Sequence, residues 1–314
     1  MARFLARRIA GSLATLLGVV VAVFFLLAAS PGDPARLAAG GGVGRRASAE
    51  AVAAFHALHG LDRPLPARLA SWLSSAARLD LGRSFRDGRP VTERIAETLP
   101  ATLAVNALAL LVAAGLGVPL GVAAARRPGG AVDRVSGLLL DALFSLPSFA
   151  LGLLLLLVFA VRLRWLPVFA DPSLGLPGIA LPVATLALVA VAPIAQVTRR
   201  AVGDALASGP ALAGRARGEG PAEETRRALR RAAPAFAGLG AALVPQLVAG
   251  SVLVERVFGL PGTGQLLADS VFSRDVPTVL GLTLVSGLAV VAAALASDAA
   301  AALTDPRIAE GEDP

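Results

Sequence analysis

The sequence predicts an all-α integral membrane protein with six transmembrane helices, and three observations support this class. The chain is 55% hydrophobic and only 16% charged, whereas an ordinary soluble domain is about 25% charged. Its mean hydropathy is +0.71, so a soluble monomer would expose too much apolar surface. Uncharged windows of at least about 20 residues, the length that crosses a bilayer as a helix, occur six times.

The six windows are apolar on all sides, as in "LGLLLLLVFA", and lack the polar stripe of a surface helix. They organise residues 9–308 as one polytopic domain between an N-terminal segment at 1–8 and a tail at 309–314. A cleaved signal peptide is the alternative for the first window, but its long apolar run favours a retained helix. The predicted spans lie at about 9–30, 98–125, 137–161, 177–198, 232–254 and 276–303.

The distribution of arginine predicts the orientation, because short cytoplasmic loops are enriched in basic residues. Arginines gather in the N-terminal segment, at 126–134 and at 199–231, which lie on one side by alternation. We therefore expect this side and both termini to be cytoplasmic. Residues 33–97 carry ten arginines on the opposite side, but segments of this length are translocated largely regardless of charge.

The long extracytoplasmic segment 33–97 is predicted to contain two helices. In "ASAEAVAAFHALHGL", Ser48 is a cap and Gly60 a stop, and "PLPARLASWLSSAARL" is typical of an amphipathic helix. His56 and His59 lie one turn apart on the first helix. As metal ligands they require further partners that the sequence does not reveal, so we favour packing or surface roles.

The residues that the chain lacks exclude several kinds of chemistry. Without lysine it contains neither a G-x-x-x-x-G-K-[ST] phosphate loop nor a Schiff-base site. The absence of cysteine, with only two histidines, excludes a Cys/His zinc site. The net charge of +7 fits cytoplasmic loops and anionic membrane headgroups better than nucleic acid.

The predicted spans carry no charge near their centres, which bears on the energy source. Gradient-coupled carriers usually keep ionisable residues at mid-membrane, whereas Asp141 and Asp298 lie near span edges, where solvation or a helix-end role explains them. We therefore expect a chain that moves a solute, is not an enzyme, and is driven by another subunit. The alternatives are a gradient-driven secondary transporter or channel without an ATPase partner, and a membrane anchor or scaffold.

The stretch "AGRARGEGPAEETRRALRR" at 213–231 concentrates six arginines and three glutamates in the longest cytoplasmic loop. Pro210 suits the first turn of a short helix over 211–217, which Gly218 ends. A second helix follows Pro221 and places Glu223 one turn before Arg227. The loop is either a docking element for a partner or an anchor at the inner membrane face.

The chain resembles the permeases of the dipeptide/oligopeptide/nickel family of binding-protein-dependent ABC importers. The likeness covers nearly the whole chain and rests on the order and spacing of its motifs. These are "RFLARRIAGSLATLLGVVVAVFFLLAASPGDPA", "TLPATLAVNALALLVAAGLGVPLGVAAA", "FSLPSFALGLLLL", "AGRARGEG", "ERVFGLPGTGQLLADSVFSRDVPTV" and "SDAAAALTDPRI".

This resemblance implies the ABC importer type I permease fold, with a long extracytoplasmic segment after the first helix. In that family the loop at 199–231 is a coupling helix that sits in a groove of the ATPase subunit. The docking positions carried over are Ala213, Gly214, Arg215, Ala216, Arg217 and Gly218.

The resemblance also implies a set of partners. They are a second permease subunit, as a heterodimer, two ATP-binding subunits that hold ATP and Mg, and an extracytoplasmic solute-binding protein. The location would be the bacterial plasma (inner) membrane, in contact with lipid. This chain would bind no cofactor, metal or nucleic acid, and its solute would be a dipeptide, an oligopeptide, nickel, glutathione or a similar small molecule.

The remaining motifs suit the outer side or bends in the spans. "GLPGTGQL" is extracytoplasmic and lacks lysine, so we interpret it as part of an outer gate or of a surface facing the binding protein, with plain turn glycines as the alternative. Pro119 and Pro147 are expected to bend their spans. The first span is predicted to end at Pro31, Gly32, Asp33 and Pro34. The outer element includes Gly259, Pro261, Gly262, Gly264, Arg274 and Asp275.

Overall fold

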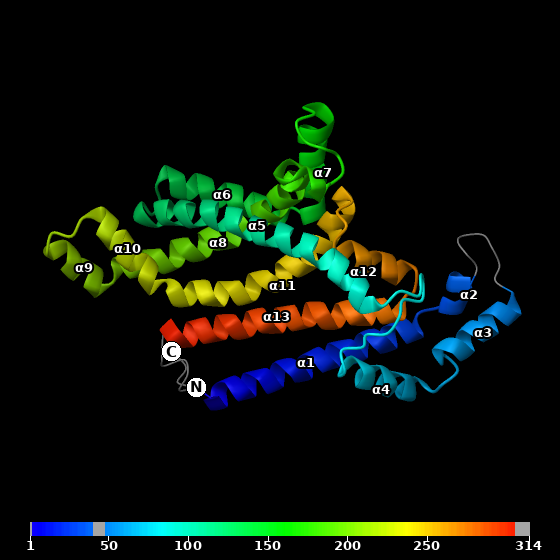
Figure 1. Ribbon diagram of the computed structural model, residues 1–314. Coiled ribbons are helices and arrows are strands. Elements are labelled where there is room, and N and C mark those ends of the chain that lie inside the picture. The colour runs from blue at the N-terminus through cyan, green and yellow to red at the C-terminus, as the bar shows by residue number, and fades with distance from the viewer. Residues whose placement is uncertain (1, 40–47, 305–314) are drawn as a thin grey trace. The chain divides into compact units, whose positions relative to one another are not determined.

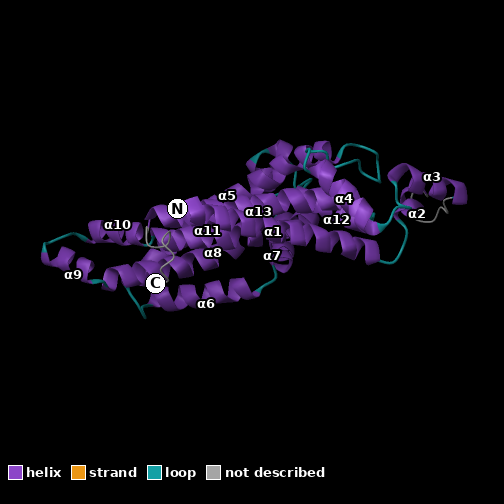
Figure 2. Ribbon diagram, turned by 90° about the horizontal axis from the view of Figure 1, so that it is seen from below, coloured by secondary structure: helices purple, strands orange, loops and turns teal. Residues whose placement is uncertain are grey.

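The computed structural model describes residues 2–39 and 48–304, and the regular elements there are helices (Figures 1 and 2). A π-helical stretch over Leu156–Arg162 continues α7, and a 3₁₀ turn covers Pro172–Leu174. The helices are α1 (Ala2–Ala29), α2 (Pro34–Ala39), α3 (Ala49–His59), α4 (Leu65–Ala76), α5 (Val91–Arg126), α6 (Ala131–Ser145), α7 (Ser148–Leu155), α8 (Leu176–Ala207), α9 (Gly209–Ala216), α10 (Pro221–Arg231), α11 (Ala233–Phe258), α12 (Thr263–Phe272) and α13 (Val276–Thr304).

The chain divides into two compact units. Unit 1 comprises Met1–Ile9, Ala101–Leu260 and Ala292–Pro314, and unit 2 comprises Ala10–Pro100 and Pro261–Val291. The predicted tail at 309–314 lies outside the described residues.

The number of spans is four or five by length and hydropathy. Ala131–Ser145 and Ser148–Arg162 make the fifth span if this bent pair is counted as one. The predicted span at 232–254 does form a helix, α11. Its apolar stretch Ala233–Pro245 is too short to count among these spans. The structure therefore supports an all-helical multi-pass chain, and the number six stays a prediction. The four helices of the described residues that are long and apolar enough are Ala6–Ala29, Val91–Arg126, Leu176–Ala207 and Val276–Ala300.

The predicted third span is not one straight helix, and Pro147 explains why. α6 ends at Ser145 and α7 begins at Ser148, with a bend of 102° between the two segments. Proline lacks the N–H that a continuing helix needs and pushes the preceding residue into an extended conformation, and Leu146 has φ −82° and ψ 133°. Pro119, by contrast, lies within α5, which continues to Arg126.

In unit 1, small residues let neighbouring helices approach α8 closely. A Cβ atom on Gly117 would lie 2.8 Å from Ile194 Cγ2, and one on Gly121 would lie 2.5 Å from the carbonyl oxygen of Ala195. α5 therefore packs almost backbone to backbone on α8. α6 also packs on α8, but it leaves large apolar side chains exposed, among them Val135 and Leu138.

In unit 2, the two helices predicted within residues 33–97 are confirmed as α3 and α4. Ser48 Oγ accepts a hydrogen bond from the Ala51 N–H at 3.1 Å and caps α3. Gly60 ends α3 in the left-handed region, at φ 61°. The apolar side of α4 buries Leu69 against a cluster formed by Leu16, Val20, Phe24 and Leu280.

Candidate functional site

The charged loop folds as two short helices joined by a glycine turn. α9 begins at Gly209, two residues earlier than predicted, because Pro210 fits the first turn after Ser208. Gly218 follows α9 with φ +81°, a conformation that favours glycine. α10 starts directly after Gly220. The predicted helix, turn and second helix are thus confirmed, with shifted ends.

Glu219 holds the turn of this loop together. Its carboxylate lies against Gly214, where a Cβ atom would be 2.9 Å from Glu219 Cδ. Arg217 Nη2 donates to Glu219 at 3.1 Å, and Arg227 Nη1 forms an ion pair with it at 2.7 Å. Gly214 is buried, so this predicted docking position serves a contact inside the loop.

Further ion pairs join the two helices and stiffen α10. Arg215 Nε donates to Glu224 at 2.5 Å. Glu223 pairs with Arg226 at 2.7 Å and with Arg227 at 3.2 Å, which confirms the predicted pair one turn apart. The hydrogen bond from Arg226 is the largest of the effects that lower the pKa of Glu223, and the same bond raises the pKa of Arg226.

The base of the loop is fixed to two long helices. Arg126 at the end of α5 donates to Thr225 Oγ1 at 2.9 Å, and Arg231 donates to Ser208 Oγ at 3.0 Å. Beneath them lies a small apolar core in which Val202 and Ala228 are buried. The exposed residues of α9 include Ala213, Ala216 and Leu212, and Leu212 is 58% exposed. The loop therefore presents a small apolar surface on a braced support.

In unit 2, the predicted helix exit and Arg274 come together. Arg274 has a positive φ of 54°, and its guanidinium donates to the carbonyl oxygens of Ser30 at 3.1 Å and Gly32 at 2.9 Å, as well as to that of Pro31. Asp33 caps the next helix by accepting from the Ala35 N–H at 2.9 Å. Arg274 thus closes the carbonyl end of α1 at the position where the sequence predicted the span to stop.

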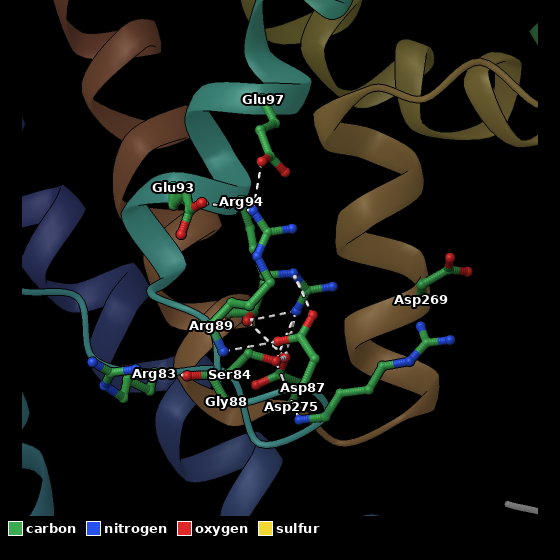
Figure 3. A network of polar contacts seen from close by, with 12 residues as sticks. Arg83, Ser84, Asp87, Gly88, Arg89, Glu93, Arg94, Glu97, Asp269 and Asp275 are labelled. Atoms are coloured by element: carbon green, nitrogen blue, oxygen red, sulfur yellow. Dashed lines mark hydrogen bonds and ion pairs between the residues drawn. The ribbon is translucent and has the colours of Figure 1, made fainter.

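Asp275, the next residue, lies at the centre of a buried polar network (Figure 3). Its carboxylate accepts from Ser84 Oγ at 2.5 Å, Arg94 Nη1 at 2.9 Å and Thr278 Oγ1 at 2.7 Å, and also from the backbone N–H of Phe85. Because Asp275 is fully buried, direct contact with a binding protein does not fit it. Ser84 and Arg94 were missed, since no local pattern links them to a residue that is 191 and 181 positions away, respectively. Thr278, three positions after Asp275, was missed as well.

The glycines of "GLPGTGQL" form the turn into a short helix. Gly259 ends α11 in the left-handed region at φ 64°, and a Cβ atom there would lie 3.2 Å from Phe169 Cδ1. After Pro261, Gly262 is the N-cap of α12, and Gly264 is buried within it. The motif therefore leads into a short helix, and whether it belongs to an outer gate or faces a binding protein stays a prediction.

The two histidines differ in their surroundings. His56 Nε2 lies 3.0 Å from Asp33 and its Nδ1 lies 3.3 Å from Asp62, whereas the His59 ring packs on Phe55 and Phe85. The hydrogen bond with Asp33 raises the pKa of His56. Burial lowers the pKa of His59. Burial also raises the pKa of Asp33, but hydrogen bonds from His56 and the Ala35 N–H outweigh it, so the pKa is lowered overall.

The two acidic residues near span edges each have a partner in unit 1. Asp298 pairs with Arg8 at 3.5 Å. Asp141 accepts a hydrogen bond from Gln196 Nε2 at 2.9 Å and is exposed on α6. It lines a pocket of about 700 Å³ between α5, α6 and α8.

The helices and apolar spans define a multi-pass membrane protein, and comparison with known proteins gives its family. Residues 117–310 match the family described as binding-protein-dependent transport system inner membrane component, and residues 1–106 match the N-terminal part of such membrane components. The chain belongs to this family and is a permease of an ABC importer.

Several named relatives are similar along their whole length. The probable peptide ABC transporter permease protein y4tP of Sinorhizobium fredii is 34% identical, over 98% of this chain and 99% of the relative. The oligopeptide transport system permease protein AppB of Bacillus subtilis is 31% identical with the same coverage. The glutathione transport system permease protein GsiC of Pectobacterium atrosepticum is 35% identical, also with this coverage.

Proposed function

We propose that this chain is one of two different permease subunits of a peptide importer in the bacterial inner membrane. Two ATP-binding subunits hold ATP and Mg and hydrolyse the nucleotide, and an extracytoplasmic binding protein delivers the solute. The chain crosses the membrane six times, with α11 as a full span, both termini in the cytoplasm and residues 33–97 outside. The relatives, which are named as peptide, oligopeptide and glutathione transport permeases, support a peptide as the solute.

The conformation of the α9–α10 loop carries the proposal for ATPase coupling. Ion pairs through Glu219 and Glu224 fix α9 against α10, so the outer side of α9 is displayed without depending on a partner for its shape. Leu212, Ala213 and Ala216 form a narrow apolar surface that suits insertion into a groove. Arg215 and Arg217 remain half-exposed, and a guanidinium has five N–H donors, which leaves donors for carboxylates of the ATPase.

The same loop is connected to the helices that line unit 1. α10 is tied to α5 by the bond between Arg126 and Thr225 and to α8 by buried Val202 and Ala228. Closure of the ATP-binding subunits would move α9 and α10 together as one body, and α5 and α8 would follow through these contacts. The residues of this chain transmit a movement and take no part in covalent chemistry.

The test is co-expression of this chain with its genomic neighbours, affinity purification through this chain, and an ATPase assay on the product. We expect a complex with a second permease and two ATP-hydrolysing subunits, whose activity rises when the binding protein and trialanine are added. Recovery of the chain without an ATPase would overturn the coupling proposal. A competent complex that transports glutathione or nickel and ignores trialanine would overturn the peptide assignment alone.

A further inference from the structure

Asp141 was predicted near a span edge, but it lies inside α6 and not at a helix end, and carboxylates within membrane spans are rare and mostly functional. It lies on α6, the first half of the bent span, and its side chain is exposed in unit 1. A carboxylate facing hydrocarbon costs about 2.5–3.5 kcal/mol even on the mildest insertion scale. Asp141 therefore faces water or polar groups in the membrane-embedded protein, and its partner on α8, Gln196, is neutral.

The surroundings of Asp141 form a pocket lined in part by charged side chains, and not only a single hydrogen bond. Asp133, Gly137 and Asp141 are spaced four residues apart, so they follow one stripe of α6 over about 12 Å. Opposite this stripe, α8 contributes Gln196 and Arg199, and Arg199 pairs with Asp133. The pocket between them measures about 700 Å³, which lies within the range of small-molecule sites, about 300–1,000 Å³.

In this pocket, the arginine that pairs with a carboxylate pairs with Asp133, whereas the contact described for the Asp141 side chain is with a neutral amide. The carboxylate of Asp133 is already matched by Arg199, and it also accepts from the backbone N–H of Gly129 at 2.8 Å. Asp141 is matched only by an amide among the contacts described for its side chain, which leaves acceptor positions on both carboxylate oxygens. Arg134 and Arg200 also line the pocket and supply positive charge at its Asp133 end.

The geometry points to Asp141 as a contact for a positively charged group of the solute during its passage, with Gln196 as the positioning residue. A solute with an ammonium group at one end and a carboxylate at the other would find a partner for each, Asp141 for the first and the pocket arginines for the second. Only the identification of this ammonium as the amino end of a peptide rests on the proposed function. Under the proposed topology the pocket lies in the cytoplasmic half of the span.

Gly137 offers a probe position with little disturbance. A Cβ atom there has no neighbouring atom within 4 Å inside the chain, and the residue lines the pocket one turn before Asp141. Because the natural chain has no cysteine, Gly137→Cys introduces the only thiol of this subunit. Asp204→Asn is a matched charge control, since Asp204 is an exposed carboxylate on α8 outside the pocket.

The first experiment measures thiol reactivity in the assembled transporter, made with cysteine-free partner subunits and held in inside-out vesicles. The probes are a trimethylammonium-ethyl and a sulfonatoethyl methanethiosulfonate, which carry opposite charges. We expect Gly137→Cys to react with both, and Asp141→Asn to lower the ratio of cationic to anionic rates about threefold or more. Asp204→Asn should leave this ratio unchanged. The inference would be overturned if Gly137→Cys did not react in the assembled transporter, as expected if the second permease covers the pocket. An unchanged ratio of rates with Asp141→Asn would also overturn it.

The second experiment measures uptake of trialanine and of N-acetyl-trialanine by the reconstituted transporter. Asp141→Asn should slow uptake of trialanine about tenfold, as for loss of one charged hydrogen bond, and leave uptake of the acetylated peptide unchanged, with Asp141→Glu restoring part of the loss. Equal effects on both peptides would overturn the ammonium contact. If the unaltered transporter carries neither peptide, the peptide proposal falls, whereas thiol labelling, which needs no solute, still decides the position of Asp141.

Discussion

The carboxylate of Asp275 accepts a hydrogen bond from the guanidinium of Arg94 at 2.9 Å, although 181 positions separate the two residues. The Asp275 side chain is 1% exposed and that of Arg94 is 11% exposed. Ser84 donates to the same carboxylate oxygen at 2.5 Å. These two hydrogen bonds to Asp275 thus join the turn before α13, the loop before α5 and the start of α5 into one polar core of unit 2 (Figure 3).

Replacing Asp275 by alanine should destabilise this core strongly. The change leaves a buried guanidinium and two hydroxyl groups without their acceptor, and breaking a buried pair in this way costs about 3–5 kcal/mol. Thermal unfolding of the purified chain in detergent would measure the loss. Asp87→Ala is the control, because Asp87 lies 3.5 Å from Arg94 Nε but is 36% exposed, so its removal should cost about 1 kcal/mol or less. Equal losses for the two variants would contradict the central role of Asp275.

A side chain at Gly214 should uncouple the ATPase by disturbing the inside of the loop. Gly214→Val would place a branched side chain where the Glu219 carboxylate now lies, so Glu219 would leave Arg217 and Arg227. We expect about tenfold less ATPase recovered with the chain, equivalent to about 1.4 kcal/mol of binding, with unchanged insertion into the membrane. Gly209→Ala serves as the control because a Cβ atom there meets nothing within 4 Å. Full ATPase recovery with Gly214→Val would show that ATPase binding does not need the contact between Glu219 and Gly214.

Local patterns predicted the short helices well because their signals are contained within a few residues. Ser48 and Gly60 mark the two ends of α3, and Pro210 and Gly218 mark those of α9, each through its own backbone preference. The bend at Pro147 was foreseen in position but not in size, since proline dictates a break and the packing of α7 on α8 and α11 sets the angle.

Contacts between distant segments were beyond such patterns. The sequence singled out Arg274 and Asp275, but nothing local indicates that one would bind carbonyl groups at the end of α1 and the other Ser84 and Arg94. Gly214 was predicted as a docking position, and the contact that the structure adds there is with Glu219, five residues on. In both cases the residues were recognisable as special, whereas their partners depended on tertiary packing.

Stability of unit 2 should fall at alkaline pH through His56. The pKa of His56 is raised by Asp33, so its pairing contributes fully below the unfolded value of about 6.5 and is lost as pH rises through the higher folded pKa. Between pH 6 and pH 9, the melting temperature of the wild type should drop by about 1–2 °C more than that of His56→Gln, as fits a partly exposed pair. Identical pH profiles for the two proteins would remove His56 as a contributor.

The proposed topology places α3 and the α9–α10 loop on opposite sides of the membrane. Glu50 is a suitable position for a cysteine on α3, because it is exposed and, unlike Ser48, does not cap the helix through its side chain. On the other side, Ala222 is exposed at the start of α10. In intact cells, an impermeant maleimide should label Glu50→Cys and spare Ala222→Cys, and in inside-out vesicles the pattern should reverse, since the natural chain has no cysteine to confuse the result. The proposed topology has an odd number of membrane crossings between the two positions, which puts them on opposite sides. Labelling of both positions from the same side would contradict this topology and the assignment of α9 as the helix that meets the ATPase.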